Sequence, residues 1–215
     1  MKKYVALDIG NVLCHVNFDN LLKEISDTLN LTLEDSLYFI NRNQKLNDLG
    51  LTNLKKELHD HTGIVSEVTI SRIMTSWNET VYANPVVLGM FNKMIAENEL
   101  QVALLSNIGH EHAHVMEHVL GVGGFFNHAI KHFSCDVGAR KPTALYYQSF
   151  LMEHPEFEGC VYVDDVLENL TAGVRFGFQP YHFALDKMDV AQELPEIEKM
   201  ILATDDKPQK NSRWH

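Results

Sequence analysis

Short apolar runs alternate with longer amphipathic segments along most of the chain. The runs consist mainly of Val, Leu, Ala and aromatic residues without a polar residue at every second position, which is typical of strands buried in a parallel sheet. We expect such strands at residues 4–7, 100–105, 129–133, 160–163 and 179–184. Parallel strands need long crossover connections, so the segments between them are expected to contain helices.

Apolar residues in those segments recur three and four positions apart, which is the spacing of an amphipathic helix. The predicted helices cover residues 19–30, 32–40, 53–61, 67–77, 86–96, 110–120, 143–153, 167–176 and 190–202. The early helices follow one another without a strand between them, whereas the later helices alternate with strands. This order predicts an α/β protein with a doubly wound, Rossmann-like parallel sheet and an inserted helical module.

The same order predicts how the chain divides into domains. We expect a core domain of residues 1–17 and 83–203, a helical domain of residues 18–82 and a polar tail of residues 204–215. A chain of 215 residues is large for one hydrophobic core and small for two. One domain with a sizeable insertion therefore fits the length.

Charge and cysteine content limit which classes of partner and which cellular compartment are expected. Lys and Arg number 18 against 29 Asp and Glu, a formal charge of −11, which argues against a nucleic-acid partner. No apolar run reaches the length of a membrane span, and the first apolar stretch is too short for a signal peptide. The cysteines Cys14, Cys135 and Cys160 are far apart and odd in number. We therefore expect no disulfide framework and a cytoplasmic location, while the oligomeric state is not indicated.

Polar residues suited to catalysis follow several of the predicted strands. Asp8 comes directly after the first strand, Ser106 after the second, and the pair Asp164-Asp165 after the strand at 160–163. In open α/β sheets, polar ligands bind at the carboxyl ends of the strands, near the point where the strand order switches. We expect these side chains to meet there, together with Lys141 from a neighbouring loop.

These groups together predict phosphoryl transfer. Asp8 and Asp165 would repel each other unless a cation lay between them, and their oxygen ligands select a hard ion such as Mg2+. Ser106 and Asn107 offer hydrogen-bond donors, and Lys141 offers a positive charge. Such a site suits a phosphoryl dianion. The expected reaction passes through an aspartyl-phosphate that water then attacks.

In sequence and order, these stretches resemble the motifs of the haloacid dehalogenase (HAD) superfamily, in its phosphatase branch. Asp8 in Val-Ala-Leu-Asp-Ile-Gly-Asn-Val-Leu is similar to the nucleophile motif, and Ser106 in Leu-Leu-Ser-Asn to the second motif. Lys141 in Gly-Ala-Arg-Lys-Pro is similar to the third, and the pair Asp164-Asp165 to the paired-aspartate form of the fourth. Within the superfamily, the chain looks most like bacterial alpha-D-glucose-1-phosphate phosphatases.

The resemblance implies a Mg2+-dependent phosphatase that acts on a small phosphorylated metabolite, such as a sugar phosphate. Residues 18–82 would be a helical cap that closes over the site and selects the substrate. Ser106 and Lys141 would hold the phosphoryl oxygens. Two interpretations of Asn107 stay open, namely contact with phosphate and a role in the turn after the strand.

The resemblance also implies a set of metal ligands. Asp8 and Asp165 would bind Mg2+ through their carboxylates, and Gly10 through its carbonyl oxygen. Asp164 would be a water-mediated partner of the metal.

One position departs from the pattern of the family. Most phosphatases of the superfamily have a second aspartate two positions after the nucleophile, where it serves as general acid and base, and here that residue is Gly10. General acid–base help contributes roughly 100- to 10,000-fold, so we expect slow turnover or a substitute group. His15 is a candidate substitute, because a histidine near its unperturbed pKa can carry a proton. The other interpretation is that His15 lines the hinge of the cap.

Two other functions stay open. The 2-haloacid dehalogenases also lack the second aspartate and need no metal, but that branch lacks the paired acids found here as Asp164 and Asp165. A non-catalytic phosphate- or partner-binding protein is the third possibility, against which the intact residues Asp8, Ser106 and Lys141 argue.

A separate motif lies in the predicted helix at 110–120. The segment from His110 to His114 matches the His-Glu-x-x-His pattern of zinc proteases, and His118 extends the same helix face. The match lies directly after the predicted strand at residues 100–105, and no Gly-x-x-His sequence follows it. We therefore do not expect a protease. The chain has 12 histidines, which makes a solvated histidine-rich face the simpler interpretation. Whether that face binds a metal is left open.

Overall fold

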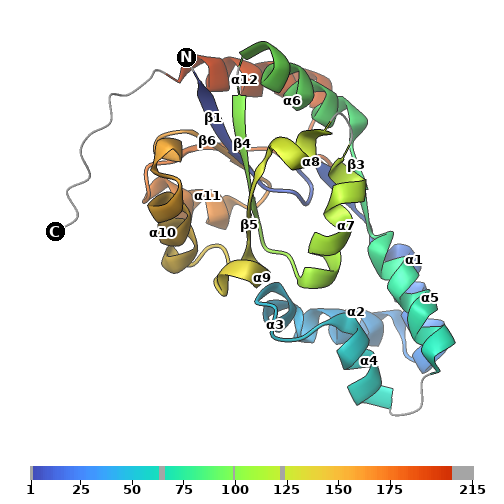
Figure 1. The fold of residues 1–215 in the computed structure, drawn as a ribbon. Coiled ribbons are helices and arrows are strands. Elements are labelled where there is room, and N and C mark those ends of the chain that lie inside the picture. Colours follow the sequence, from blue (N-terminus) through green and yellow to red (C-terminus); the bar gives the residue numbers. More distant parts are fainter. Residues whose placement is uncertain (1, 63–65, 99, 122–123, 205–215) are drawn as a thin grey trace.

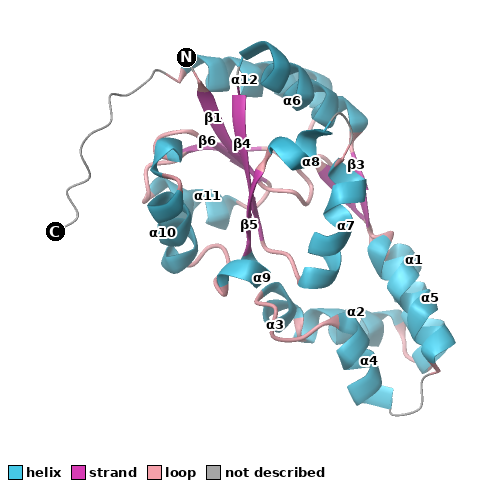
Figure 2. Ribbon diagram, in the orientation of Figure 1, coloured by secondary structure: helices cyan, strands magenta, loops and turns pink. Residues whose placement is uncertain are grey.

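A parallel sheet of five strands forms the centre of the molecule, in the order β5-β4-β1-β6-β7 (Figure 2). The computed structural model describes residues 2–62, 66–98, 100–121 and 124–204. The strands are β1 (Lys3–Leu7), β4 (Leu100–Ser106), β5 (Ile130–Phe133), β6 (Val161–Asp164) and β7 (Gln179–His182). The chain adds β4 and β5 on one side of β1, and then β6 and β7 on the other. The predicted doubly wound α/β fold is confirmed, with the switch in strand order at β1.

Helices cover both faces of the sheet (Figure 1). One face packs against α6 (Pro85–Asn98), α7 (His110–Leu120), α8 (Phe125–His128) and α12 (Val190–Ala203). The other packs against α10 (Ala144–Glu153), the 3-10 helix η2 (Pro155–Phe157) and α11 (Leu167–Val174). Side chains alternate along each strand, so β1 sends Val5 and Leu7 into the first hydrophobic cluster and Ala6 into the second. Because β1 is buried on both faces, its sequence is apolar without alternation.

The early helices form a separate group with its own hydrophobic cluster, and we call this group the helical unit. It consists of α1 (Asp19–Leu29), α2 (Leu33–Arg42), α3 (Gln44–Asp48), α4 (Leu54–Thr62) and α5 (Glu67–Asn78). Leu21, Ile25, Leu58 and Ile73 are buried inside it. Figure 1 shows the unit beside one end of the core, next to α7 and α9 (Ser134–Val137). The predicted domain boundaries at residues 18 and 82 stay a prediction.

Two short strands connect the helical unit to the core. β2 (Cys14–Val16) and β3 (Val81–Ala83) form an antiparallel pair, which the hydrophobic pattern did not predict. Three residues are too few to show a strand periodicity, and the short helices α3 and α9 escaped for the same reason. The polar tail predicted from residue 204 lies outside the described residues apart from Thr204. Among the described helices, none has the length and apolar character needed to cross a bilayer.

Candidate active site

The turn after β1 fixes the carboxylate of Asp8. The Asp8 N–H donates to the carbonyl oxygen of Val163 at 2.9 Å, which continues the pairing of β1 with β6. Its Oδ1 accepts a hydrogen bond from the N–H of Ile9 at 2.7 Å. The chain then reverses through Asn11, whose φ of 52° lies in the left-handed region. The Asp8 side chain is therefore held in one direction at the end of the central strand, where it is buried.

Lys141 supplies the positive charge of the site. Its side chain is 1 % exposed, which is rare for a lysine unless it is paired. Its Nζ lies 3.0 Å from Oδ1 of Asp8 and 2.7 Å from Oδ2 of Asp164. The backbone of Lys141 is held by Asn107, because Asn107 Nδ2 donates to the Lys141 carbonyl at 3.0 Å and Asn107 Oδ1 accepts from the Lys141 N–H at 2.8 Å. These contacts favour a positioning role for Asn107 over contact with phosphate.

Asp164 anchors the lysine from the far side. Its carboxylate is fully buried and accepts hydrogen bonds from Lys141 Nζ, the Tyr162 hydroxyl, Asn169 Nδ2 and the N–H of Val166. Tyr162 and Asp164 are two residues apart on β6, so their side chains lie on the same face. Both carboxylate oxygens of Asp164 are thus engaged by protein donors. This arrangement suits a residue that orients Lys141, and a water-mediated contact of Asp164 with a metal stays a prediction.

Asp165 is the least buried of the three acids. Its Oδ2 accepts a hydrogen bond from Asn11 Nδ2 at 3.2 Å, and the side chain is half-buried. Carboxylate oxygens of Asp8, Asp164 and Asp165 all lie within 4.8 Å of one another. Ser106 is the buried last residue of β4, the strand that pairs with β1 on the other side. The fold therefore brings Asp8, Lys141 and the two later aspartates together and ends the neighbouring strand in Ser106.

The charges in the crevice do not balance, because three carboxylates face one ammonium group. Burial raises the pKa of Asp8 to about 7; Lys141 works against this rise, whereas Asp164 and Asp165 add to it. Burial alone would lower the pKa of Lys141, but Asp164 and Asp8 together raise it, so the ammonium stays protonated. Burial also raises the pKa of Asp165. A hard divalent cation bound by carboxylate oxygens would offset the excess negative charge, so this donor set fits Mg2+.

Gly10 and His15 are the two residues on which the prediction about proton transfer depends. A Cβ added at Gly10 would meet only Cγ2 of Val16, at 3.4 Å, so the backbone there leaves room for a side chain. His15 lies on β2, where its ring stacks on Tyr82 with centroids 5.1 Å apart and its Nε2 lies 3.1 Å from Nδ2 of Asn84. These contacts belong to the connection between the core and the helical unit. They favour the hinge interpretation of His15 over the proton-carrying one.

Sequence reasoning did not find two residues that shape the site. Asn11 binds Asp165, and Tyr162 binds Asp164 while its ring lies 5.8 Å from the ammonium of Lys141. The position of Tyr162, two residues before Asp164 in a buried strand, could have indicated a shared face. The contact of Asn11 joins residues 154 positions apart, which no local pattern reveals.

Comparison with solved structures identifies the fold. No family model and no curated protein matches the sequence. Solved structures do match: a HAD family enzyme from Bacteroides thetaiotaomicron, in complex with magnesium and inorganic phosphate, superposes with a TM-score of 0.73 and 14 % identity, covering 90 % of this chain and 99 % of that one. The chain has the fold of HAD family enzymes.

Other HAD proteins match as well. A predicted HAD-like family hydrolase from Porphyromonas gingivalis has a TM-score of 0.73 at 16 % identity and covers 95 % of this chain and 100 % of that one. An L-2-haloacid dehalogenase has a TM-score of 0.54 at 17 % identity and covers 86 % of this chain and 85 % of that one. Identities this low concern the fold alone. The choice between phosphate ester and haloacid as substrate must therefore come from the site.

Proposed function

We propose that the protein is a HAD-like, Mg2+-dependent phosphatase of a small phosphorylated metabolite of the sugar phosphate class. One observation carries this proposal: Asp165 and Asp8 present carboxylate oxygens to the same point, beside a lysine already held by Asp164. A carboxylate that attacks carbon needs no second carboxylate beside it. A site for a metal ion and a phosphoryl group does need one, because the second carboxylate helps to bind the metal. The magnesium and phosphate in the Bacteroides structure support the same choice.

Asp8, Lys141 and Ser106 would perform the phosphoryl transfer. A carboxylate oxygen of Asp8 forms a bond to phosphorus while the bond from phosphorus to the ester oxygen breaks, and the leaving alkoxide takes up a proton from water, since Gly10 supplies no acid. Lys141 and the Ser106 hydroxyl bind the nonbridging oxygens, where charge is held in the transition state. Water then attacks phosphorus, which releases phosphate and restores Asp8.

Mg2+ would be held by the carboxylates of Asp8 and Asp165 and by the carbonyl oxygen of Gly10. When bound, it supplies charge neutralisation for the phosphoryl oxygens and lets Asp8 stay ionised beside the other acids. Asp164 would contribute by fixing Lys141.

The helical unit would act as the cap that selects the substrate. It contacts the core close to Lys141, because Arg140 Nη2 lies 2.9 Å from Oδ2 of Asp48 and Ser134 Oγ donates to the carbonyl oxygen of Asp48 at 2.5 Å. A Cβ added at Gly109 would lie 2.0 Å from Oδ1 of Asn47, so the unit approaches the backbone of the segment after β4 as well.

The proposal is tested by assaying hydrolysis of p-nitrophenyl phosphate with Mg2+ and with EDTA. We expect activity that requires Mg2+ and is abolished by Asp8→Asn, with circular dichroism showing an intact fold. Asp186→Asn changes an exposed aspartate in the loop after β7 and serves as the control. Activity of Asp8→Asn close to that of the wild type would remove Asp8 from the mechanism.

A parallel assay separates the dehalogenase. Release of chloride from 2-chloropropionate without metal, together with no hydrolysis of a phosphate ester panel, would replace the phosphatase by that function. Absence of both activities, with phosphate binding retained, would indicate the non-catalytic protein.

A further inference from the structure

The histidines of the helix with the His-Glu-x-x-His sequence do not form a common cluster of metal-ligand side chains among the described residues. Of its histidines, His114 and His118 are exposed and contribute to no cluster of metal-ligand side chains among the described residues. His112 instead contacts the helical unit, with its ring stacked on Trp77 at 4.1 Å between centroids. His110, at the first position of α7, lies among side chains of a different kind.

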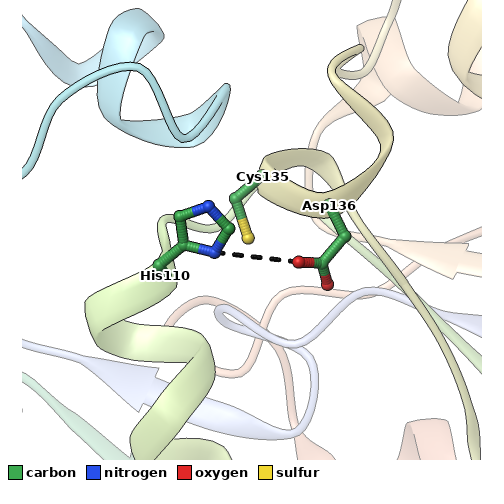
Figure 3. Close-up of side chains that lie close together, drawn as sticks. All are labelled: His110, Cys135 and Asp136. Atoms are coloured by element: carbon green, nitrogen blue, oxygen red, sulfur yellow. Dashed lines mark ion pairs between the residues drawn. The ribbon is translucent and has the colours of Figure 1, made fainter.

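His110 converges with two residues of α9. Its ring nitrogen, the sulfur of Cys135 and a carboxylate oxygen of Asp136 all lie within 4.8 Å of one another (Figure 3). The distance from His110 Nδ1 to Asp136 Oδ1 is 3.7 Å. In tetrahedral zinc sites the bonds to nitrogen, oxygen and sulfur are about 2.0 to 2.3 Å long, which places neighbouring ligand atoms roughly 3.3 to 3.8 Å apart. The distance between His110 and Asp136 falls within this range, and the sulfur of Cys135 lies within 4.8 Å of a ligand atom of each.

The backbone that carries these side chains is fixed. Ser134, the residue before Cys135, accepts a hydrogen bond on Oγ from the N–H of Ile108 at 2.9 Å, which ties α9 to the segment that leads into α7. Gly50 of the helical unit packs over the cluster, since a Cβ there would lie 2.6 Å from His110 Nε2 and 3.0 Å from the Cys135 carbonyl oxygen. The cluster therefore lies at the junction of the core with the helical unit.

We propose that His110, Cys135 and Asp136 form a second metal site, which binds a Zn2+-class ion through one nitrogen, one sulfur and one oxygen. Thiolate and imidazole ligands favour Zn2+ over Mg2+, so this site differs in selectivity from the carboxylate crevice. Three protein ligands leave the fourth tetrahedral position to water. The exposed side chains of His110 and Asp136 give the ion a path from solvent.

Other roles for the cluster fit less well. Burial raises the pKa of the Cys135 thiol to about 11, so Cys135 is not a reactive nucleophile at neutral pH. The Cys135 thiol donates a hydrogen bond to the Asp136 carboxylate, and His110 lies 3.7 Å from that carboxylate, so the three groups already meet at one point. A metal ion uses all three groups, with release of the thiol proton on binding.

Titration with Co2+ of the untagged protein tests the site by absorption spectroscopy. The Asp8→Asn background is used to weaken the carboxylate crevice, so the result does not depend on the proposed phosphatase. We expect a thiolate-to-cobalt charge-transfer band with a tetrahedral ligand-field spectrum. An excess of Mg2+ leaves both unchanged, and Zn2+ bleaches them.

The variants decide which residues bind the ion. Cys135→Ser should remove the charge-transfer band. His110→Ala changes an exposed side chain and leaves the core intact. It should weaken Co2+ binding by more than about 10-fold, which is the lower end of the loss seen when a residue that supports a metal ligand is removed. His114→Ala, on the same helix, is the matched control and should bind as the parent does. No band in the parent, a band that survives Cys135→Ser, or equal loss in His114→Ala would each overturn the proposal.

Discussion

At the scale of single residues, Gly10 stands where the superfamily pattern has an acid, and nothing in the local backbone requires a glycine. An added Cβ would meet only Val16, at 3.4 Å, and the φ angle of Gly10 is not left-handed. We therefore predict that Gly10→Asp raises kcat for a phosphate ester, because it supplies the missing acid and base. The expected gain is roughly 100-fold or more, measured by steady-state kinetics.

Choice of substrate and control sharpens this test. Alkyl phosphates have a poor leaving group that needs a proton. The rise in kcat caused by Gly10→Asp should therefore be larger with an alkyl phosphate than with p-nitrophenyl phosphate. Gly10→Asn has the same shape without an acid and should stay near the wild-type rate. Equal rates for Gly10→Asp and Gly10→Asn would show that proton transfer at this position does not limit turnover.

Asn107 gives a second prediction at this scale. Because its amide binds both backbone groups of Lys141, Asn107→Ala should let the lysine shift away from Asp8 and the phosphoryl oxygens. A misplacement of about 1 Å can cost on the order of 100-fold in rate, so kcat/KM should fall by about that factor. Asn127→Ala, at an exposed position of α8, is the control. Unchanged kinetics in Asn107→Ala would assign Asn107 to the turn alone.

At the scale of elements, α7 joins the core to the helical unit through hydrogen bonds of partly buried polar side chains. His112 Nε2 lies 2.9 Å from the Trp77 carbonyl oxygen and 3.2 Å from Oγ1 of Thr80. Glu111 accepts hydrogen bonds from the N–H groups of Leu54 and Lys55, at the start of α4. Negative charge at the first turn of a helix is favourable. Glu111 of the zinc-protease pattern, and His112 at one of its unspecified positions, thus serve in docking.

The burial of His112 predicts how this docking responds to pH. Burial lowers the pKa of His112 below its ordinary value of 6.5, so the unfolded chain takes up a proton in a range where the folded protein does not. The contribution of His112 to the free energy of unfolding should therefore be constant above about pH 6.5 and fall as the pH drops below it, by about 1.4 kcal/mol for each unit that separates the two pKa values. The raised pKa of Asp8 acts in the opposite sense over the same range, so the effect of His112 is found by comparing variants.

Urea unfolding between pH 5 and pH 7.5 measures this effect. His112→Gln should make the slope with pH less positive than in the wild type, while the lowered pKa of buried His132 and the raised pKa of Asp8 contribute equally to both proteins. His114→Gln, at an exposed position of the same helix, should keep the full slope. Identical slopes for the two variants would mean that His112 does not carry the pH dependence.

Sequence pattern predicted some elements well and others not at all. The strands of the sheet and the helices α7 and α12 were found within a residue or two, because buried strands and amphipathic helices have long, distinct patterns. The pair β2 and β3 was missed, as were α3 and α9, because each is too short for a period to show. The docking of α7 on the helical unit depends on contacts between distant residues, which no local pattern encodes.

At the scale of the whole molecule, the strand order explains why the site could be anticipated. The strands on either side of β1 are parallel to it, so their carboxyl ends lie at the same edge of the sheet. The acids that follow β1 and β6 therefore lie close together regardless of how the loops fold. The supports of the site were less predictable. Asn11, Tyr162 and the two-point contact of Asn107 follow from how loops and side chains pack, and motif matching gave no role for the first two. Topology thus fixes which groups meet, and packing fixes how each is held.

The same excess of negative charge predicts that Mg2+ stabilises the folded protein as a whole. Three carboxylates lie within 4.8 Å of one another around one lysine, so an ion that binds the folded state relieves their repulsion. Ligand at about 100 times its Kd contributes about 2.7 kcal/mol, which for a chain of this size corresponds to a rise in Tm of roughly 5 to 10 °C.

Thermal unfolding with Mg2+ and with EDTA measures the rise. Asp165→Ala should lose most of it, because Asp165 is a proposed ligand, while Asp186→Ala should retain it. An equal rise in both variants would show that the stabilising ion is bound elsewhere than in the crevice at the end of β1.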